Sequence, residues 1–241
     1  MGDKDRVHGS LEVLDLLYRE FKNGNLNEER LFEIITQKYP SFAILYSFYD
    51  WIVSHKDADI ELFLKKMLEN RLRVKKTATN LLASYKRFFT YSRSSQVLEV
   101  LKEVKNLEKV YITESRPGRE GVLVANELLD TGIYVVLGVD MIVEEFIRES
   151  ECVILGSDAL FEDSFVNKIG TRIVIRLAEE YKRPVFVLSL PQKKIKEEYR
   201  RYFKIENEPP EEIFPESHPR LNVVNKYFEF VPLYPHIRLI V

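Results

Sequence analysis

Polar and charged residues follow four short apolar runs of this 241-residue sequence. Ser-Arg-Ser-Ser follows the run at 87–91, Glu-Ser-Arg-Pro-Gly follows 110–113, Gly-Ser-Asp follows 152–155, and a serine with two lysines just beyond follows 185–188. Serine hydroxyls, arginine side chains and the free N–H groups of helix N-termini all bind phosphate oxygens. The pattern therefore predicts an anion site. Its candidate phosphate ligands are Ser92, Arg93, Ser94, Ser95 and Arg116.

Two further charged residues are candidates for chemistry at this site. Asp158 is the carboxylate that directly follows an apolar run and a Gly-Ser pair, so it can serve as a general acid or base or bind sugar hydroxyls. Lys168 is expected in the first turn of a helix over 168–181, where the helix dipole disfavours a cation. Its position therefore indicates an anionic ligand or a carboxylate nearby.

A purely structural interpretation remains open for each of these residues. Ser94 can be only the N-cap of the helix that follows it. Asp158 can cap a short helix through residues 159–160. Arg116 can pair with Glu114 or Glu120. The prediction of a site therefore depends on the convergence of several polar clusters and not on any one residue.

Other chemistries find no support in the sequence. The phosphate-binding loop G-x-x-x-x-G-K-[ST], the dinucleotide fingerprint G-x-G-x-x-G and the nucleophile elbow G-x-S-x-G do not occur. The four histidines lack the spacing of metal ligands, and Cys152 is expected in the interior of a buried strand. We therefore expect no metal and no cofactor.

The composition is that of a globular protein with a charged surface. Hydrophobic residues make up 45% and charged residues 31%, and 36 Lys+Arg against 38 Asp+Glu give a net charge of −2. This balance argues against a nucleic-acid coat protein. The sequence shows no membrane span or signal peptide, and we expect a soluble cytoplasmic protein. Few glutamines among many Glu, Lys and Arg are a pattern found in thermophiles.

The predicted elements place the polar clusters at one edge of a sheet. Apolar residues at three- and four-residue spacing predict four helices in a helical domain over residues 1–82, with Ser10 and Asn27 as N-caps of the first two and the fourth beginning at residue 57. Short apolar runs then alternate with amphipathic helices over 83–241, and residues 192–222 form an irregular excursion. This order predicts an α/β fold: an N-terminal helical domain followed by a Rossmann-like, doubly wound parallel sheet. Ligands of such sheets bind at the carboxyl ends of the strands.

Three motifs within this second part resemble a known family. They are Thr-Glu-Ser-Arg-Pro at 113–117 with Glu-Gly at 120–121, Gly-Ser-Asp-Ala-Leu at 156–160, and Val-Asn-Lys-Ile-Gly-Thr at 166–171. In order and spacing they resemble the initiation factor 2B alpha/beta/delta family, which includes methylthioribose-1-phosphate isomerase and ribose-1,5-bisphosphate isomerase. The resemblance covers about residues 85–241, including the tail at 228–232.

The resemblance implies roles for several residues. The catalytic aspartate of the isomerases corresponds to Asp158, and their substrate-contacting Asn-Lys pair corresponds to Asn167 and Lys168. Their catalytic cysteine lies in a T-H-C motif, where this chain has Ser92. A serine hydroxyl has a far higher pKa than a thiol and is a poor acid or base without an activating partner.

Two further family features differ. Glu120 replaces a glutamine of the isomerases and adds negative charge where a bisphosphate would lie, and the N-terminal R-G-A motif of the isomerases has no counterpart. The pattern is closer to the delta-type subunits, so the resemblance implies a non-isomerase, regulatory subunit homologue. Such a protein would bind a sugar phosphate or nucleotide, form a homodimer or higher oligomer, and act in translation initiation with an initiation factor 2 subunit as a candidate partner.

Two alternatives stay open. The first is an aldose–ketose isomerase of sugar phosphates, in which Asp158 is the acid and base, Ser92 is a hydroxyl donor, and Arg93, Arg116, Asn167 and Lys168 hold the substrate. The second is a scaffold that binds no ligand.

Overall fold

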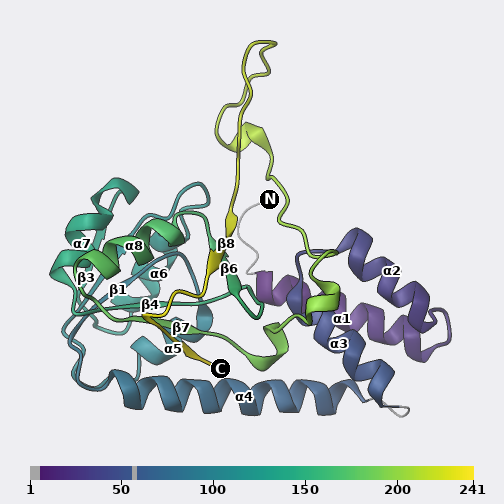
Figure 1. The fold of residues 1–241 in the computed structure, drawn as a ribbon. Coiled ribbons are helices and arrows are strands. Elements are labelled where there is room, and N and C mark those ends of the chain that lie inside the picture. The colour runs from purple at the N-terminus through teal and green to yellow at the C-terminus, as the bar shows by residue number, and fades with distance from the viewer. Residues whose placement is uncertain (1–5, 56–58) are drawn as a thin grey trace.

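A parallel sheet of six strands forms the centre of the second part of the chain, in a computed structural model that describes residues 6–55 and 59–241. The strand order is β3-β2-β1-β4-β7-β9, and every neighbouring pair is parallel. The predicted α/β fold with a Rossmann-like sheet is therefore confirmed (Figure 1). The strands are β1 (Arg87–Thr90), β2 (Lys109–Thr113), β3 (Val135–Gly138), β4 (Cys152–Leu155), β7 (Val185–Leu188) and β9 (Ile237–Ile240).

Helices cover both faces of this sheet. Alternate residues of the strands pack on α4 (Ile60–Leu82), α5 and α6 on one face, and on α7 and α8 on the other. Burial on both faces explains why β4 and β7 are continuously apolar and fully buried. The bounds of these helices are α5 (Ser95–Leu101), α6 (Glu120–Leu129), α7 (Val143–Glu149) and α8 (Thr171–Glu180).

The first part of the chain is helical, as its periodicity indicates. It contains α1 (Arg6–Lys22), α2 (Glu28–Lys38) and α3 (Ala43–Ser54). The expected N-cap Asn27 accepts a hydrogen bond from the Arg30 N–H at 2.8 Å. The expected cap at Ser10 is wrong, because α1 begins at Arg6 and Ser10 is buried inside the helix. The polar residues 1–5 and the expected start of the fourth helix at residue 57 lie outside the described residues.

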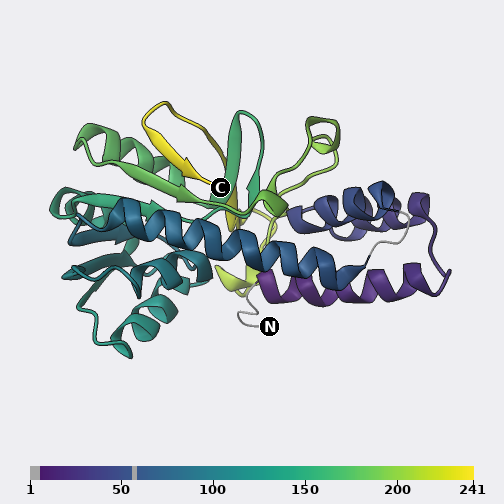
Figure 2. The same cartoon turned by 90° about the horizontal axis from the view of Figure 1, so that it is seen from below.

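The long helix α4 (Ile60–Leu82) runs beneath both parts of the chain (Figures 1 and 2). Its early residue Phe63 packs into the core of α1–α3, whereas Val74, Ala78 and Leu82 pack into the core under the sheet. The division into domains at residues 82 and 83 remains a prediction, since one helix contributes to both cores.

A small antiparallel sheet follows β4 and corrects two expectations. It consists of β5 (Ala159–Leu160), β6 (Ser164–Lys168) and β8 (Phe228–Pro232) in the order β5-β6-β8. Residues 159–160 are thus a strand and not a short helix, and Lys168 ends a strand instead of opening a helix. The partner strand of β6 lies about 60 residues away in the sequence, so its pairing is not visible in the local pattern.

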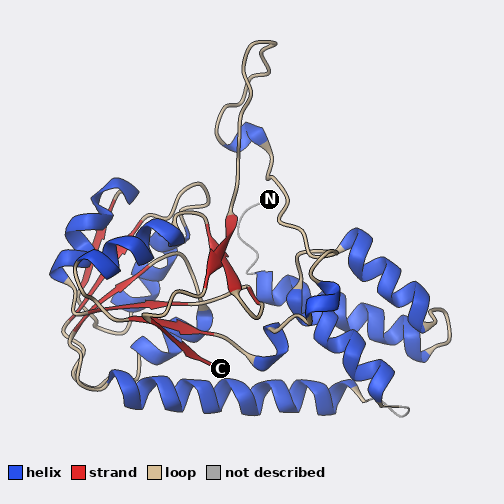
Figure 3. Ribbon diagram, viewed as in Figure 1, coloured by secondary structure: helices blue, strands red, loops and turns tan. Residues whose placement is uncertain are grey.

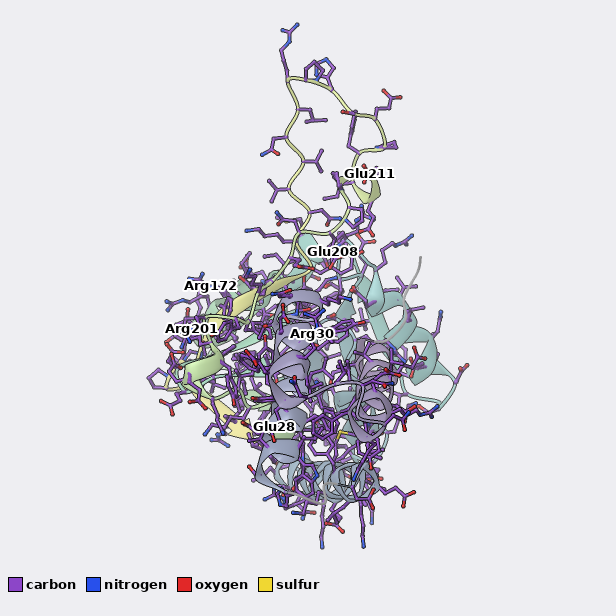
Figure 4. All side chains as sticks on the ribbon, turned by 90° about the vertical axis from the view of Figure 1, so that its right-hand side faces the viewer. Glu28, Arg30, Arg172, Arg201, Glu208 and Glu211 are labelled. Carbon is purple, nitrogen blue, oxygen red and sulfur yellow. The ribbon has the colours of Figure 1, made fainter. Side chains whose placement is uncertain are left out.

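Residues 207–226 form an arm that projects away from the rest of the molecule (Figures 1 and 3). The bridge between Asn207 and Lys226 closes its base, and all of residues 209–222 are exposed. Glu208 lies near the base and Glu211 further out (Figure 4). The irregular excursion expected over 192–222 therefore includes most of this arm. Within the described residues, no helix is long and apolar enough to cross a membrane.

Candidate functional site

The carboxyl ends of β1 and β4 meet where the strand order reverses, which is the position where open α/β sheets bind ligands. The loops after these two strands are in close contact. A Cβ atom added to Gly156 would lie 2.5 Å from the Ser94 Oγ, so the contact requires glycine at this position. The fold thus brings the Ser-Arg-Ser-Ser and Gly-Ser-Asp clusters together, as the sequence predicts.

A cavity of about 130 Å³ lies between the segments that follow β4 and β7 and the N-terminal helices. Asp158, which is half-buried, and Lys193 contribute charged groups from the sheet side, and Arg71 contributes one from α4. The Lys193 Nζ donates a hydrogen bond to the Ser157 backbone oxygen at 2.6 Å. The remaining lining is mostly apolar and comes from α1, α3 and the turn before it, α4, and the segment after β7: Ser10, Leu11, Ser41, Phe42, Ala43, Ile44, Met67, Leu68 and Leu190.

Ser92 lies at the end of β1 but does not line this cavity. Its φ angle is 61°, and its backbone N–H donates to the Ser115 Oγ at 2.8 Å. No hydrogen bond among the described residues reaches the Ser92 hydroxyl. The neighbouring Tyr91 donates from its hydroxyl to the Ile169 carbonyl at 2.8 Å, and burial raises the pKa of Tyr91 above its usual range. Neither residue is thus paired with a base that could activate Ser92.

Carboxylates of the protein itself accept hydrogen bonds from backbone N–H groups that the sequence predicts as phosphate donors. Asp140 accepts from the N–H groups of Ser115 and Arg116 at 2.8 and 2.7 Å. Glu229 accepts from the N–H groups of Gly170 and Arg172 at 2.9 and 3.0 Å, at the N-terminus of α8. These donors are therefore already satisfied within the protein.

Lys168 forms a buried ion pair with Glu120. The distance from the Lys168 Nζ to the Glu120 Oε1 is 2.5 Å, and the side chains are 0% and 13% exposed. The Lys168 Nζ also lies 4.2 Å from the centroid of the Tyr227 ring. The Glu120 Oε2 is buried with no hydrogen-bond partner among the described residues. The carboxylate expected near Lys168 is thus Glu120, although Lys168 lies in a strand.

Tyr227 connects this ion pair to the arm. Its hydroxyl donates to the Glu212 Oε2 at 2.7 Å, and the same oxygen accepts from the Asn225 Nδ2 at 2.9 Å. Burial and the bond to Glu212 raise the pKa of Tyr227 above its usual range.

The remaining phosphate-ligand candidates have structural contacts or lie in solvent. Ser94 caps α5, since its Oγ accepts from the Val97 N–H at 3.4 Å, and Ser95 is the first residue of that helix. The Arg93 Nε donates to the Glu127 Oε1 at 2.9 Å. The proposed cap role of Ser94 is confirmed.

Arg116 is exposed, and neither suggested pairing occurs. Glu114 pairs with Arg119 at 3.5 Å, while Glu120 pairs with Lys168. Asn167 is buried and its Nδ2 donates to the Thr171 Oγ1 at 3.0 Å, so it orders the turn into α8.

Cys152 is completely buried in β4, as expected, and burial raises the pKa of its thiol. Across residues 6–55 and 59–241, no group of three or more His, Cys, Asp or Glu side chains is arranged to hold a metal ion.

Sequence reasoning missed several residues of the site. Arg71, Asp140, Tyr227 and Glu229 come from elements outside the polar clusters, and only the tertiary fold brings them in. Lys193 has a weak signal, since it lies shortly after the carboxyl end of β7.

Comparisons with known proteins agree with the motifs. The model of the initiation factor 2 subunit family matches residues 53–240. The ribose 1,5-bisphosphate isomerase of Methanocaldococcus jannaschii is 32% identical over 175 residues, which are 69% of this chain and 56% of the relative. The translation initiation factor eIF-2B subunit 2-like protein of Pyrococcus furiosus is 31% identical over 188 residues, 73% of this chain and 68% of that relative.

A solved structure of the Pyrococcus horikoshii translation initiation factor eIF-2B superposes with a TM-score of 0.75. It is 25% identical, and the match covers 96% of this chain and 86% of that one. The chain spans little more than half of the isomerase relative but most of this solved structure. Because the family model matches most of its length, the chain belongs to the initiation factor 2 subunit family.

Proposed function

We propose that this protein is a regulatory, non-catalytic member of the family, similar to the delta-type subunits, that binds a phosphorylated small molecule. The environment of Ser92 carries the proposal. A serine that replaces the family's cysteine needs a base to activate it, and no described residue hydrogen-bonds its hydroxyl. The ligand would be a sugar phosphate or a nucleotide.

The cavity beside Asp158 supports a ligand of this class. Lys193 hydrogen-bonds a neutral carbonyl, and no carboxylate of the described residues forms a salt bridge with it. Among the cations that line the cavity, Lys193 is therefore the one best able to bind a phosphate, and Asp158 can accept hydrogen bonds from sugar hydroxyls. The apolar part of the lining fits a sugar ring or base.

Assembly is the second part of the proposal. Members of the family form oligomeric eIF2B complexes. We infer a homodimer or higher oligomer in the cytoplasm, with an initiation factor 2 subunit as a candidate partner in translation initiation.

The alternative is a sugar-phosphate aldose–ketose isomerase. It is favoured by the retained Asp158 at the cavity and by the relative described as ribose 1,5-bisphosphate isomerase. In that case Asp158 would move the proton between the two carbons, and Ser92 would act as a hydroxyl donor.

Phosphorus and carbon NMR of the protein with ribose 1,5-bisphosphate, methylthioribose 1-phosphate and ribose 5-phosphate separates the two. The regulatory proposal expects line broadening of a ligand without any new resonance. Ketose resonances with wild type and with the Asp130→Asn control, but not with Asp158→Asn, would establish the isomerase instead. Asp130 is a suitable control because it is exposed at the end of α6.

A further inference from the structure

We propose that two copies of this protein associate through the open edge of β3, with their β3 strands antiparallel across a twofold axis. The central sheet would then continue from one copy into the other. This inference rests on the oligomer of the proposed function and specifies its interface. Three features of the edge support it: its apolar side chains, its free backbone groups and the charges at its two ends.

The segment that contains β3 exposes large apolar side chains. Residues 131–139 include no charged residue. The exposed side chains in and next to this run, at 63%, 45%, 60% and 90%, are Tyr134, Leu137, Val139 and Met141. Figure 1 shows β3 on the side of the sheet away from α1–α3, so these helices do not cover it. Apolar side chains gathered on an otherwise charged surface mark a site of association.

The strand at the opposite edge of the sheet has the protection that β3 lacks. β9 carries Arg238, which is exposed. A charged side chain on an edge strand opposes pairing with a further strand, whereas an apolar edge strand without one invites it. Both strands end the same six-stranded sheet, so only the β3 edge is suited to pairing.

Backbone groups of β3 are open on its outer side. Within the sheet β3 pairs with β2 alone, and the carbonyls of Tyr134 and Gly138 accept from N–H groups of β2 and the residue after it, at 2.9 and 2.8 Å. Successive residues of a strand direct their backbone groups to alternate sides, so those of Val135 and Leu137 point to the open edge. An antiparallel strand would satisfy these groups, and a twofold axis lets identical strands satisfy each other.

The charges at the two ends of β3 favour a second copy as the partner. Lys109 lies at the amino end, where its Nζ is 5.2 Å from the Tyr134 ring centroid. Glu145 lies beyond the carboxyl end, exposed in the first turn of α7. Neither side chain forms a salt bridge within the described residues. Antiparallel pairing brings the amino end of each strand to the carboxyl end of the other, and so a lysine toward a glutamate on both sides of the axis.

The test measures the mass of the protein in solution by sedimentation equilibrium, for wild type, Leu137→Lys and Leu62→Lys. Leu62 is a matched control, because it is also 45% exposed but lies at the start of α4. We expect a wild-type dimer. Leu137→Lys should raise its dissociation constant about a hundredfold, because both copies lose an apolar contact and bring like charges together at the axis. Leu62→Lys should leave the dissociation constant unchanged.

Two charge reversals test the direction of pairing. Lys109→Glu and Glu145→Lys should each raise the dissociation constant about tenfold, and the protein with both substitutions should regain the wild-type value. These variants keep the proposal testable if Leu137→Lys folds poorly. Weakening by both single reversals without recovery in the double variant would overturn the antiparallel arrangement.

The outcomes separate this interface from the proposed function. Equally stable dimers of wild type and Leu137→Lys would overturn the β3 interface and leave the proposed oligomer intact. A wild-type protein that stays monomeric would overturn both the interface and the oligomer. The binding of a phosphorylated ligand is measured separately by NMR and would be unaffected by either result.

Discussion

Substituting Lys168 by methionine should destabilise the protein strongly, because it strands a carboxylate in the interior. Methionine keeps the apolar stem of the side chain but removes the ammonium that lies 2.5 Å from Glu120. Breaking a buried ion pair by removing one partner costs about 3–5 kcal/mol, and a desolvated cation–aromatic contact contributes about 2 kcal/mol. Glu120 keeps 13% of its side chain exposed and can recover some hydration. We therefore expect a loss of about 3 kcal/mol in the free energy of unfolding.

The assay is urea unfolding followed by circular dichroism at 222 nm, with Lys168→Met, Glu120→Gln and the double variant. The double variant removes both charges, so it should be more stable than Lys168→Met alone, with a coupling energy of about 2 kcal/mol between the two positions. A loss below about 1 kcal/mol for Lys168→Met, or additive losses in the double variant, would refute the buried pair as described.

Three further predictions test other parts of the structure. Gly121→Ala should destabilise by more than about 3 kcal/mol in the same urea assay, because its Cβ would lie 1.8 Å from a β2 carbonyl oxygen, whereas Gly9→Ala, with nothing within 4 Å, should be neutral or stabilising by up to about 1 kcal/mol. Cys152 should resist iodoacetamide at pH 8 until the protein is unfolded, because the thiol is buried and its pKa is raised; rapid alkylation of the folded protein would contradict its placement. Burial tends to raise the pKa of Glu151, but hydrogen bonds from two backbone N–H groups at the start of β1 hold this pKa below its usual range. Glu151→Gln should therefore cost about 1 kcal/mol of stability at pH 7. That contribution is complete above the unfolded pKa of about 4.3 and is lost as the pH falls through the lowered pKa, so the unfolding curves of wild type and variant should converge in acid.

The central sheet can be predicted from the sequence, because each strand is marked by a pattern in its own residues. Strands buried on both faces are continuous apolar runs, and their alternation with helices implies parallel pairing. The Gly156 contact with the loop after β1 follows from the same topology, since neighbouring parallel strands end at one edge. These features need no knowledge of distant partners.

The site is less predictable because distant residues complete it. Lys168 looks like a helical residue from its neighbours, yet β8 pairs with its segment from about 60 residues away and makes it a strand. Asp140 and Glu229 turn expected phosphate donors into internal hydrogen bonds. Their side chains give no local signal, because an acidic residue in a loop or strand is usually only solvated.

The placement of the ligand in the cavity beside Asp158, at the carboxyl ends of β4 and β7, is tested most directly by amide chemical shifts. Wild-type protein labelled with ¹⁵N would be titrated with ribose 5-phosphate, and the perturbed amides assigned. The proposal predicts the largest shifts at Gly156, Ser157, Asp158 and Lys193, with no conversion of the sugar. Shifts confined to other surfaces, or none at millimolar ligand, would contradict a ligand site at this edge of the sheet.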